Sequence, residues 1–459
     1  VRPSWRRSEG AAFVGLAFAA MTVSIMQTMV VPILGAISSH LGTSLADTSW
    51  VLTATLVSAA VLTPIFGRLG DQRGKRRMLV ACLSLVTVGS LVAALAPSLG
   101  VLVVGRALQG AGTGVFPLAL SLLRDRVPAR QLTTRMAFIS TTLMTGGGIG
   151  LVLTGAVVQG GRGYQAVFWL AAALSLLALL GVALLVSESL VTRSGRIDWL
   201  GAVLFSALLT LLLLALAQGA TWGWTSTATL ACVGGAAVCA VAWVIAERQV
   251  PEPLIDLAMF LHRPVLLVNV AALLLGLAMY CQFIGVATLV QLPGYGFGAT
   301  IERAAVQFLL PSALTAAVVA PLGGVLVNRI GANRTLGLGA LGGVAAFGGL
   351  AIWHHEPLEV VVATVAGGCA VALTFASMPA LIVAAVPLAQ TGIANGLNAI
   401  SRSVGASVAS AVVAAVLTAA QPRPGGLPGE RAFTAIFLLA ATVCAVAAVA
   451  AAQARPRRA

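Results

Sequence analysis

Residues 64–79 read P-I-F-G-R-L-G-D-Q-R-G-K-R-R-M-L, and residues 321–336 read P-L-G-G-V-L-V-N-R-I-G-A-N-R-T-L. The two stretches share proline, glycine, leucine, glycine, arginine and leucine in register, and Asp71 of the first corresponds to Asn328 of the second. A further set recurs at almost the same offset: Pro128, Gln131, Ala137 and Gly146 correspond to Pro387, Gln390, Gly396 and Gly405. Two matches at nearly one offset indicate a duplicated half.

The composition excludes a soluble globule. The chain has 459 residues, of which 59% are hydrophobic and 9% charged, against roughly 25% charged in soluble proteins. Mean hydropathy is +1.01. Windows of about 20 apolar residues, enough to cross the hydrocarbon core, predict fourteen membrane helices. Their approximate limits are 11–38, 48–69, 78–97, 99–122, 134–159, 166–187, 198–218, 226–246, 265–291, 304–327, 335–353, 358–383, 392–420 and 432–453.

In the repeat, the second expected helix corresponds to the tenth and the fifth to the thirteenth. Equivalent helices are therefore eight positions apart in the order of helices. The sequence therefore predicts an all-α integral membrane protein with two six-helix bundles and two inserted helices. We expect the first bundle at residues 1–190, the inserted pair at 191–250 and the second bundle at 251–459.

The basic residues predict the orientation. A net charge of +14 would suit nucleic-acid binding, but the 27 Lys and Arg are scattered through short loops, so nucleic acid is not an expected partner. With a cytoplasmic N-terminus, only Arg162, Arg303, Arg423 and Arg431 fall in outer loops and only Arg106 and Arg402 inside helices. Because basic loops stay inside, we expect a multi-pass protein of the inner (plasma) membrane with both termini cytoplasmic.

The stretch from Gly67 to Arg77 resembles the signature between helices 2 and 3 of the major facilitator superfamily. Within that superfamily, the chain resembles the fourteen-helix drug:proton antiporters over nearly its whole length. The resemblance implies a gating loop that holds the start of the thirteenth helix, with the candidate residues Gly67, Asp71, Arg73, Gly74, Arg76 and Arg77. The alternative is a basic loop that only sets topology.

Two further motifs are similar to those of the family. Arg106-Ala-Leu-Gln109-Gly-Ala-Gly-Thr-Gly resembles its helix 4 signature and implies that Arg106 and Gln109 take part in proton transfer; the alternative is an arginine that snorkels to the interface. Gly146, Gly150 and Gly155 form a degraded version of its helix 5 antiporter signature, which close helix packing explains nearly as well.

Around the two inserted helices, the chain resembles the fourteen-helix branch of the family. The matching residues are Asp198-Trp199-Leu200-Gly201, Glu247-Arg248 and Pro253-Leu254-Ile255.

The first helix lacks the membrane-embedded aspartate of many relatives, because no acid occurs between Glu9 and Asp47. The candidate substrate cavity has polar and basic residues only: Gln27, Thr28, Gln282, Asn395, Asn398 and Arg402. An unpaired cation is costly in a low-dielectric cavity. We therefore expect neutral or weakly acidic amphipathic substrates, with Arg106 or Arg402 able to pair an anion.

Loops this short hold no nucleotide-binding domain, so uphill transport would draw on an ion gradient. The function favoured by the sequence is a secondary, proton-coupled exporter of small amphipathic compounds such as drugs or antibiotics. Uptake of a small metabolite is the alternative, and a membrane enzyme or receptor is least favoured. The expected partners are the substrate, protons and the lipid bilayer; we expect a monomer without a cofactor.

His354-His355-Glu356-Pro357 faintly resembles a zinc motif. Pro357 would break the helix, however, and Glu359 stands where the second histidine of the motif belongs. The six cysteines lie in apolar runs without a C-x-x-C pair. We therefore expect an outer loop here and no metal site.

Overall fold

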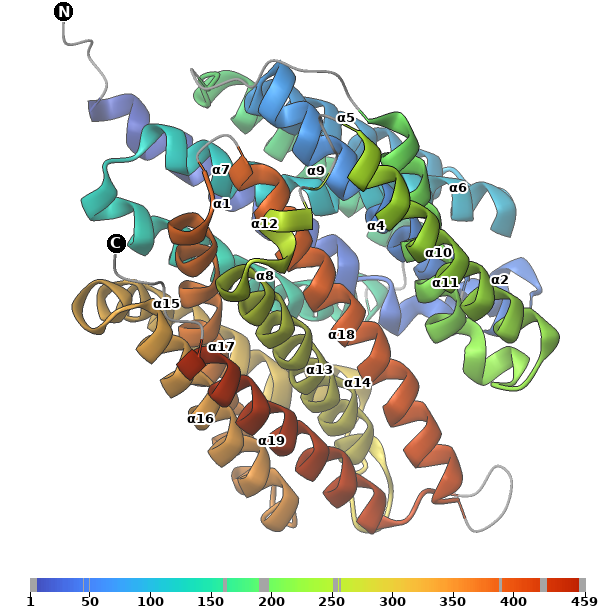
Figure 1. Cartoon of the computed structure of the whole chain (residues 1–459). Coiled ribbons are helices and arrows are strands. Elements are labelled where there is room, and N and C mark those ends of the chain that lie inside the picture. The colour runs from blue at the N-terminus through green and yellow to red at the C-terminus, as the bar shows by residue number, and fades with distance from the viewer. Residues whose placement is uncertain are drawn as a thin grey trace, which may run out of the picture.

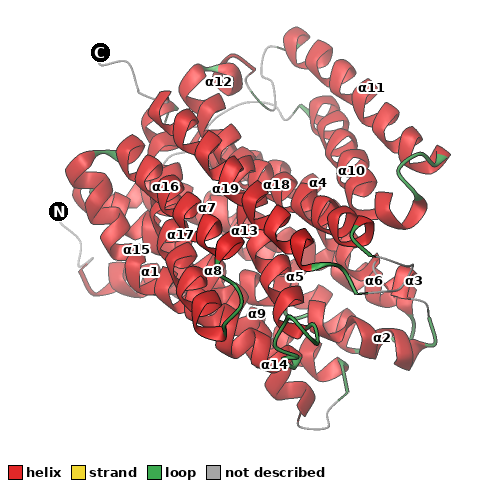
Figure 2. Ribbon diagram, turned by 90° about the horizontal axis from the view of Figure 1, so that it is seen from below, coloured by secondary structure: helices red, strands yellow, loops and turns green. Residues whose placement is uncertain are grey.

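The computed structural model describes residues 6–43, 45–48, 50–159, 163–189, 198–250, 255, 257–387, 390–421 and 427–453. Within these ranges every regular element is helical (Figure 2). Fourteen helical stretches are long and apolar enough to cross a membrane, which confirms the predicted number. The predicted residues Arg162, Pro253, Leu254 and Arg423, and the boundary at 190/191, lie outside the described residues.

The first half packs around α1, which contacts α8 and α9, while α5 contacts α6 and α9. Its helices are α1 (Arg6–Thr28), α2 (Leu34–Leu41), α3 (Leu45–Thr48), α4 (Trp50–Arg73), α5 (Lys75–Ala94), α6 (Leu99–Gln109), α7 (Val115–Arg126), α8 (Ala129–Gln159) and α9 (Gln165–Leu185), with 3₁₀ turns η1 (Val31–Ile33) and η2 (Gly110–Gly114).

The second half packs around α13, which contacts α18 and α19, while α16 contacts α17 and α19. Its helices are α13 (Arg263–Gln291), α14 (Ile301–Arg303), α15 (Leu310–Ile330), α16 (Ala332–Ile352), α17 (Pro357–Ala385), α18 (Thr391–Ala419) and α19 (Glu430–Gln453). A π-helical turn, η3 (Ala304–Leu309), precedes α15.

Between the halves the chain forms α10 (Trp199–Trp222), α11 (Thr227–Gln249) and the short α12 (Leu257–Leu261). Figure 1 shows α10 and α11 in green at the side of the molecule; α10 contacts α4 and α18 as well as α11. The motif residues of this region meet: Asp198 caps α10 by accepting the Gly201 N–H at 2.8 Å. A Cβ on Gly201 would lie 3.0 Å from the Glu247 carboxylate.

The first expected helix, 11–38, is not continuous, and this limit was wrong. α1 ends at Thr28, and η1 and α2 follow in its place. Pro32 has no N–H to donate to the carbonyl of Thr28, four residues earlier, and its ring clashes with that carbonyl. The helix therefore ends where the proline removes its hydrogen bond.

The same cause explains irregular turns in the fourth and tenth helices. Pro117 lies four residues after Thr113, which falls in the 3₁₀ turn η2. Pro311 lies four residues after Gln307, which falls in the π turn η3. A helix-interior proline disturbs the turn before it, so both spans contain a change of helix type.

The predicted gating loop is almost entirely helical, which corrects the expected limits at 69 and 78. α4 runs to Arg73 and α5 starts at Lys75, so Gly74 alone forms the turn, at φ +111°. The equivalent Gly331 turns between α15 and α16 at φ +92°. Glycine reaches positive φ without the steric cost of a Cβ, and the shared turn shows that the sequence repeat is also a structural one.

Candidate functional site

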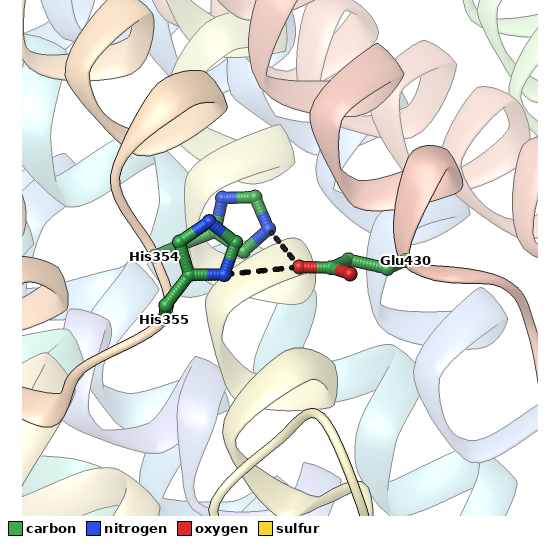
Figure 3. Close-up of side chains that lie close together, drawn as sticks. All are labelled: His354, His355 and Glu430. Carbon is green, nitrogen blue, oxygen red and sulfur yellow. Dashed lines mark ion pairs between the residues drawn. The ribbon is translucent and has the colours of Figure 1, made fainter.

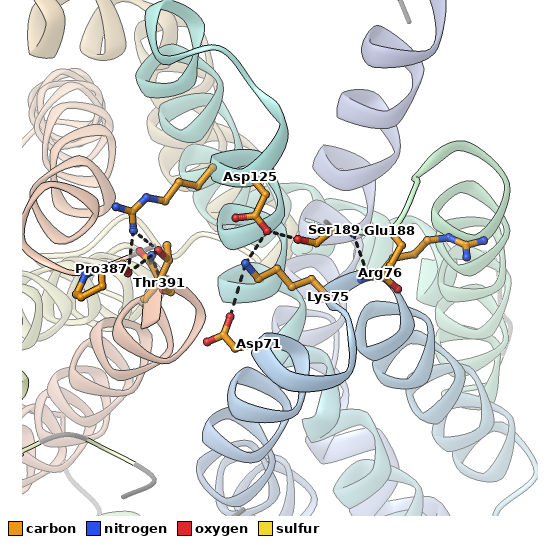
Figure 4. Close-up of polar contacts among 10 residues, drawn as sticks. Asp71, Lys75, Arg76, Asp125, Glu188, Ser189, Pro387 and Thr391 are labelled. Carbon is orange, nitrogen blue, oxygen red and sulfur yellow. Dashed lines mark hydrogen bonds and ion pairs between the residues drawn. The ribbon is translucent and has the colours of Figure 1, made fainter. Parts of the chain in front are cut away.

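A buried charge cluster lies at the turn between α4 and α5 (Figure 4). Lys75 Nζ lies 2.6 Å from Asp125 Oδ2 and 3.7 Å from Asp71 Oδ1. All three side chains are at most 2% exposed. The Ser189 hydroxyl also donates to Asp125 Oδ2. Two carboxylates around one ammonium leave an excess negative charge, which the buried Arg68 of α4 offsets in part.

The start of α18, from the other half, also stabilises the negative charge, because the Ile393 N–H donates to Asp71. A Cβ on Gly392 would lie 2.9 and 3.0 Å from the two carboxylate oxygens of Asp71, so Asp71 sits directly against the first turn of α18. The N-terminus of a helix carries partial positive charge and free N–H groups. Asp71 therefore joins the two halves through a charge–dipole contact.

Arg124 makes the complementary contact on α17. Its guanidinium donates to the carbonyls of Val383 at 2.8 Å, Val386 at 3.1 Å and Pro387 at 3.3 Å, and to the Thr391 hydroxyl. These carbonyls lie at the C-terminus of α17, the negative end of its dipole. We call Asp71, Lys75, Arg124 and Asp125 the charged junction, because together they fasten the first half to the ends of α17 and α18.

Glu188 holds the start of α5. Its carboxylate accepts the backbone N–H groups of Arg76 at 2.9 Å and Arg77 at 3.1 Å. A Cβ on Gly74 would lie 2.7 Å from this carboxyl group. Gly74 is thus required twice, for its backbone angle and for the space that Glu188 fills.

The six predicted gating residues do not act alike. Asp71 contacts the opposite half, and a Cβ on Gly67 would lie 3.7 Å from the backbone of α18, an ordinary van der Waals distance. Arg73 and Arg77 are exposed, and the Arg76 guanidinium donates to the Ala183 carbonyl at 2.6 Å, within its own half.

Four further residues of this region were not predicted from the sequence: Lys75, Arg124, Asp125 and Glu188. The spacing of four between Asp71 and Lys75 was an available signal for an ion pair. Nothing comparable marks the other three, because their partners are distant in the sequence.

Arg106 is 2% exposed in α6. Its Nε donates to the Val51 carbonyl at 3.1 Å and its Nη1 to Gln109 Oε1 at 2.6 Å. Gln109 in turn donates to the Ser90 hydroxyl at 2.8 Å. Among the described residues no carboxylate pairs with Arg106, so its charge is held by neutral dipoles, and Arg106 does not reach the aqueous interface as a snorkelling arginine would.

A cavity of about 10 Å³ lies beside this group, with Gln27, Thr55, Arg106 and Gln109 among its lining residues. It has room for about one water, whereas drug-sized ligands need several hundred cubic ångströms. The side chain of Gln27 is exposed at its edge. In this conformation the polar pocket of the first half is too small for a drug-sized molecule.

Arg402 forms a separate group in the second half. Its guanidinium lies over the rings of Phe375 at 4.8 Å and Phe116 at 5.4 Å, and donates to Asn398 Oδ1 at 3.2 Å. Asn398 in turn donates to Asn269 Oδ1 at 3.2 Å. Because Phe116 belongs to α7, this group also bridges the two halves.

The other predicted cavity residues lie elsewhere. Thr28 donates to the Gly147 carbonyl at 2.9 Å and so joins α1 to α8. Buried Asn395 donates to the Thr391 carbonyl of its own helix at 3.0 Å. Gln282 is 4% exposed and lies against Gly367 of α17. The structure therefore separates the predicted set and does not gather it around one cavity.

The α8 glycines serve packing at two of three positions. A Cβ on Gly146 would lie 2.7 Å from the Met21 carbonyl, and one on Gly150 would overlap Thr28. At Gly155 the nearest atom is 3.9 Å away. α8 is one unbroken helix from Ala129 to Gln159, so close packing against α1 explains Gly146 and Gly150.

The sequence family can now be assigned. The family model described as Major Facilitator Superfamily matches residues 16–353 and 268–459. The chain belongs to the Major Facilitator Superfamily. It consists of two pseudo-equivalent halves, which meet at the ends of α17 and α18. Two additional membrane helices, α10 and α11, lie between the halves in the sequence.

Similar curated proteins differ in their stated substrates. The chain is 28% identical to the multidrug resistance protein Stp of Mycobacterium tuberculosis, over 78% of this chain and 66% of that relative. It is 28% identical to the tetracenomycin C resistance and export protein of Streptomyces glaucescens, over 86% of this chain and 73% of that relative. It is 26% identical to the uridine/deoxyuridine transporter of Lactococcus lactis subsp. cremoris, over 91% and 88%. The match thus spans slightly less than two thirds of Stp.

Solved structures of the superfamily share the fold. The human organic anion transporter MFSD10 (TETRAN) superposes with a TM-score of 0.70 at 15% identity, over 98% of this chain and 100% of that one. The nucleoside transporter NupG gives a TM-score of 0.59 at 14% identity, over 97% and 100%.

Proposed function

We propose that this protein is a secondary active transporter that exports small amphipathic compounds in exchange for protons. The observation that carries the proposal is the charged junction. Its contacts are made by Asp71 and Arg124 to helix ends of the other half, so a rigid movement of one half would break them together without unfolding either half. Such a reversible fastening suits alternating access.

Export as the direction rests on relatives. Two of the relatives described above carry names that state multidrug resistance or export. The predicted topology would place the charged junction on the cytoplasmic side, since it lies among the basic ends of α4, α5 and α7. A junction that closes this side suits a transporter that releases its substrate outwards.

Proton coupling is proposed for Arg106. Its guanidinium is buried, and among the residues that the structure describes its hydrogen-bond partners are neutral, so a change in nearby charge would alter its hydrogen bonds strongly. Gln109 and Ser90 continue the hydrogen-bonded chain away from it. The neutral surroundings also leave Arg106 free to take an anionic partner during the cycle.

The proposed substrates are neutral or weakly acidic. Arg402, whose guanidinium lies over the rings of Phe116 and Phe375, offers positive charge beside aromatic surface. A carboxylate or phenolate with an apolar body would match it, whereas a permanent cation would be repelled.

Uptake of a nucleoside is the second candidate. The uridine/deoxyuridine transporter covers more of this chain than either efflux relative does. The substrates in its name, uridine and deoxyuridine, are polar and uncharged. The amides of Asn269 and Asn398 near Arg402 could also bind such a molecule. Direction separates the two proposals.

The test is accumulation of a labelled panel in cells with and without the protein, before and after the proton gradient is dissipated. The panel contains neutral, weakly acidic and quaternary ammonium amphiphiles, together with uridine. Lower accumulation of the first two classes, restored when the gradient is lost, is expected. Strong gradient-dependent protection from quaternary ammonium dyes, or gradient-driven gain of uridine, would contradict the proposal.

A further inference from the structure

Three potential metal ligands meet far from the charged junction. His354 and His355 follow the C-terminus of α16, at the opposite end of that helix from Gly331, and Glu430 begins α19. Glu430 Oε1 lies 3.3 Å from His354 Nε2 and 3.2 Å from His355 Nδ1 (Figure 3). The ligand atoms all lie within 4.8 Å of one another.

The hydrogen bonding of His354 fixes which nitrogen carries its proton. Nδ1 lies 2.7 Å from the Leu350 carbonyl, and a carbonyl oxygen only accepts. Nδ1 therefore carries a hydrogen, and Nε2 is the nitrogen that faces the Glu430 carboxylate. His354 is 3% exposed, and Nε2 has no hydrogen-bond partner among the residues that the structure describes.

Two ring nitrogens face one carboxylate oxygen, since Glu430 Oε1 lies 3.3 Å from His354 Nε2 and 3.2 Å from His355 Nδ1. The two rings stack with their centroids 4.9 Å apart, which keeps both nitrogens close to that oxygen. One divalent ion would satisfy all three ligands at once.

The two distances from Glu430 Oε1, 3.2 and 3.3 Å, fit such an ion. Zinc binds His nitrogen and carboxylate oxygen at about 2.0–2.2 Å in tetrahedral geometry, which places neighbouring ligand atoms about 3.3 Å apart. A histidine ligand commonly donates its second N–H to a backbone carbonyl, as His354 does. We propose that His354, His355 and Glu430 bind one Zn²⁺ or similar divalent transition-metal ion.

The other acids of this loop do not compete for the ion. Glu359 accepts the backbone N–H groups of His355 at 3.0 Å and Glu356 at 3.1 Å, and with Glu356 it completes the capping box of α17. This cap orients His355. The side chains of His355 and Glu430 are 65% and 40% exposed, so the ion can enter from solvent and keep a water as its fourth ligand.

The bound ion would tie the loop between α16 and α17 to the start of α19, within one half of the molecule. Under the topology proposed above, this corner faces the outside. The expectation of no metal site came from the absence of a second histidine in local register. The third ligand instead comes from Glu430, 75 positions further along the chain.

The test uses the full chain, purified in detergent with an affinity tag free of histidine and stripped with a chelator. Zn²⁺ is titrated against a chromophoric chelator, and Co²⁺ is added separately to record its visible d–d absorption. We expect one tight equivalent, the intense Co²⁺ bands of four-coordinate geometry, and a higher Tm with metal. His355→Ala and Glu430→Gln should each weaken binding by roughly tenfold or more.

His40→Ala is the matched control, because His40 is exposed in α2 and outside the cluster; it should bind as the wild type does. Equal binding by wild type and Glu430→Gln, or none by the wild type, would overturn the proposal and leave the two histidines and Glu430 as a polar cluster without a metal.

Discussion

At the scale of single residues, the charged junction places a lysine out of water between two carboxylates. Removing one partner of a buried ion pair commonly costs about 3–5 kcal/mol, because the remaining charge stays buried without compensation. Asp71 and Asp125 stabilise the Lys75 charge unequally, since Lys75 Nζ is 2.6 Å from Asp125 and 3.7 Å from Asp71. Asp125 is thus the structural partner, and Asp71 is the one free to serve the contact with α18.

Asp71→Asn should therefore abolish transport while membrane abundance stays near that of the wild type. Lys75 keeps Asp125, so the fold is retained, but the charge at the N-terminus of α18 is lost, worth up to about 2 kcal/mol in partly buried geometries. Transport rate per molecule and abundance by immunoblot measure the two effects. Asn328→Ala, at the equivalent exposed position of the second half, is the control. Normal transport by an abundant Asp71→Asn protein would leave the motif as a topology signal only.

Arg106→Ala should lose transport driven by a pH gradient. The change removes the buried charge and leaves the Val51 carbonyl and Gln109 Oε1 without their donor. Exchange of labelled for unlabelled substrate, which needs no net proton movement, should be impaired less than gradient-driven flux. Unchanged gradient-driven flux would assign Arg106 a purely structural role.

At the scale of helices, the duplicated turns allow one half to act as a control for the other. Gly74 and Gly331 both have positive φ, but Glu188 lies against Gly74, whereas no atom lies within 4 Å of a Cβ at Gly331. A non-glycine residue in such a conformation costs about 1–3 kcal/mol. The same substitution should therefore have unequal effects at the two turns.

Gly74→Ala should lower the Tm of the purified protein more than Gly331→Ala does. Both variants suffer backbone strain, and only Gly74→Ala must also displace the carboxylate that caps α5. Thermal unfolding followed by intrinsic fluorescence measures the difference. Equal Tm values would mean that Glu188 moves aside without cost.

The sequence predicted the helices better than the contacts between them. Hydropathy predicted the fourteen helices, and the repeat predicted the equivalence of Gly74 and Gly331. Both signals can be read from short contiguous stretches of the sequence. The helix end at Thr28 and the π turn before Pro311 were missed because the hydropathy windows did not consider the hydrogen bonds that a proline removes.

Contacts between distant residues were the harder part of the site. Arg124 was visible only as a basic residue, since its acceptors are carbonyls more than 250 positions away. Glu430 carried no signal that linked it to His354 for the same reason. Gly67 was predicted as a gating residue, but the tighter contact between the halves is at its repeat partner: a Cβ on Gly324 would lie 2.5 Å from Thr134 Cα.

At the scale of the whole molecule, fourteen crossings require both termini on one side of the membrane. The basic residues predict that this side is cytoplasmic. A C-terminal reporter that fluoresces only in the cytoplasm should therefore be bright, and a reporter active only outside should be silent. The opposite pattern would invert the map and place the charged junction on the outer face.

The direction of transport and its coupling to protons can be measured together in one preparation. In everted membrane vesicles, the lumen corresponds to the outside of the cell, and respiration acidifies it. A proton-coupled exporter should accumulate a labelled weakly acidic amphiphile in this lumen while it is acidic, and should release it when the gradient is collapsed; vesicles with Asp71→Asn should not accumulate it. Accumulation that requires an alkaline lumen, or that is the same without the protein, would contradict the account.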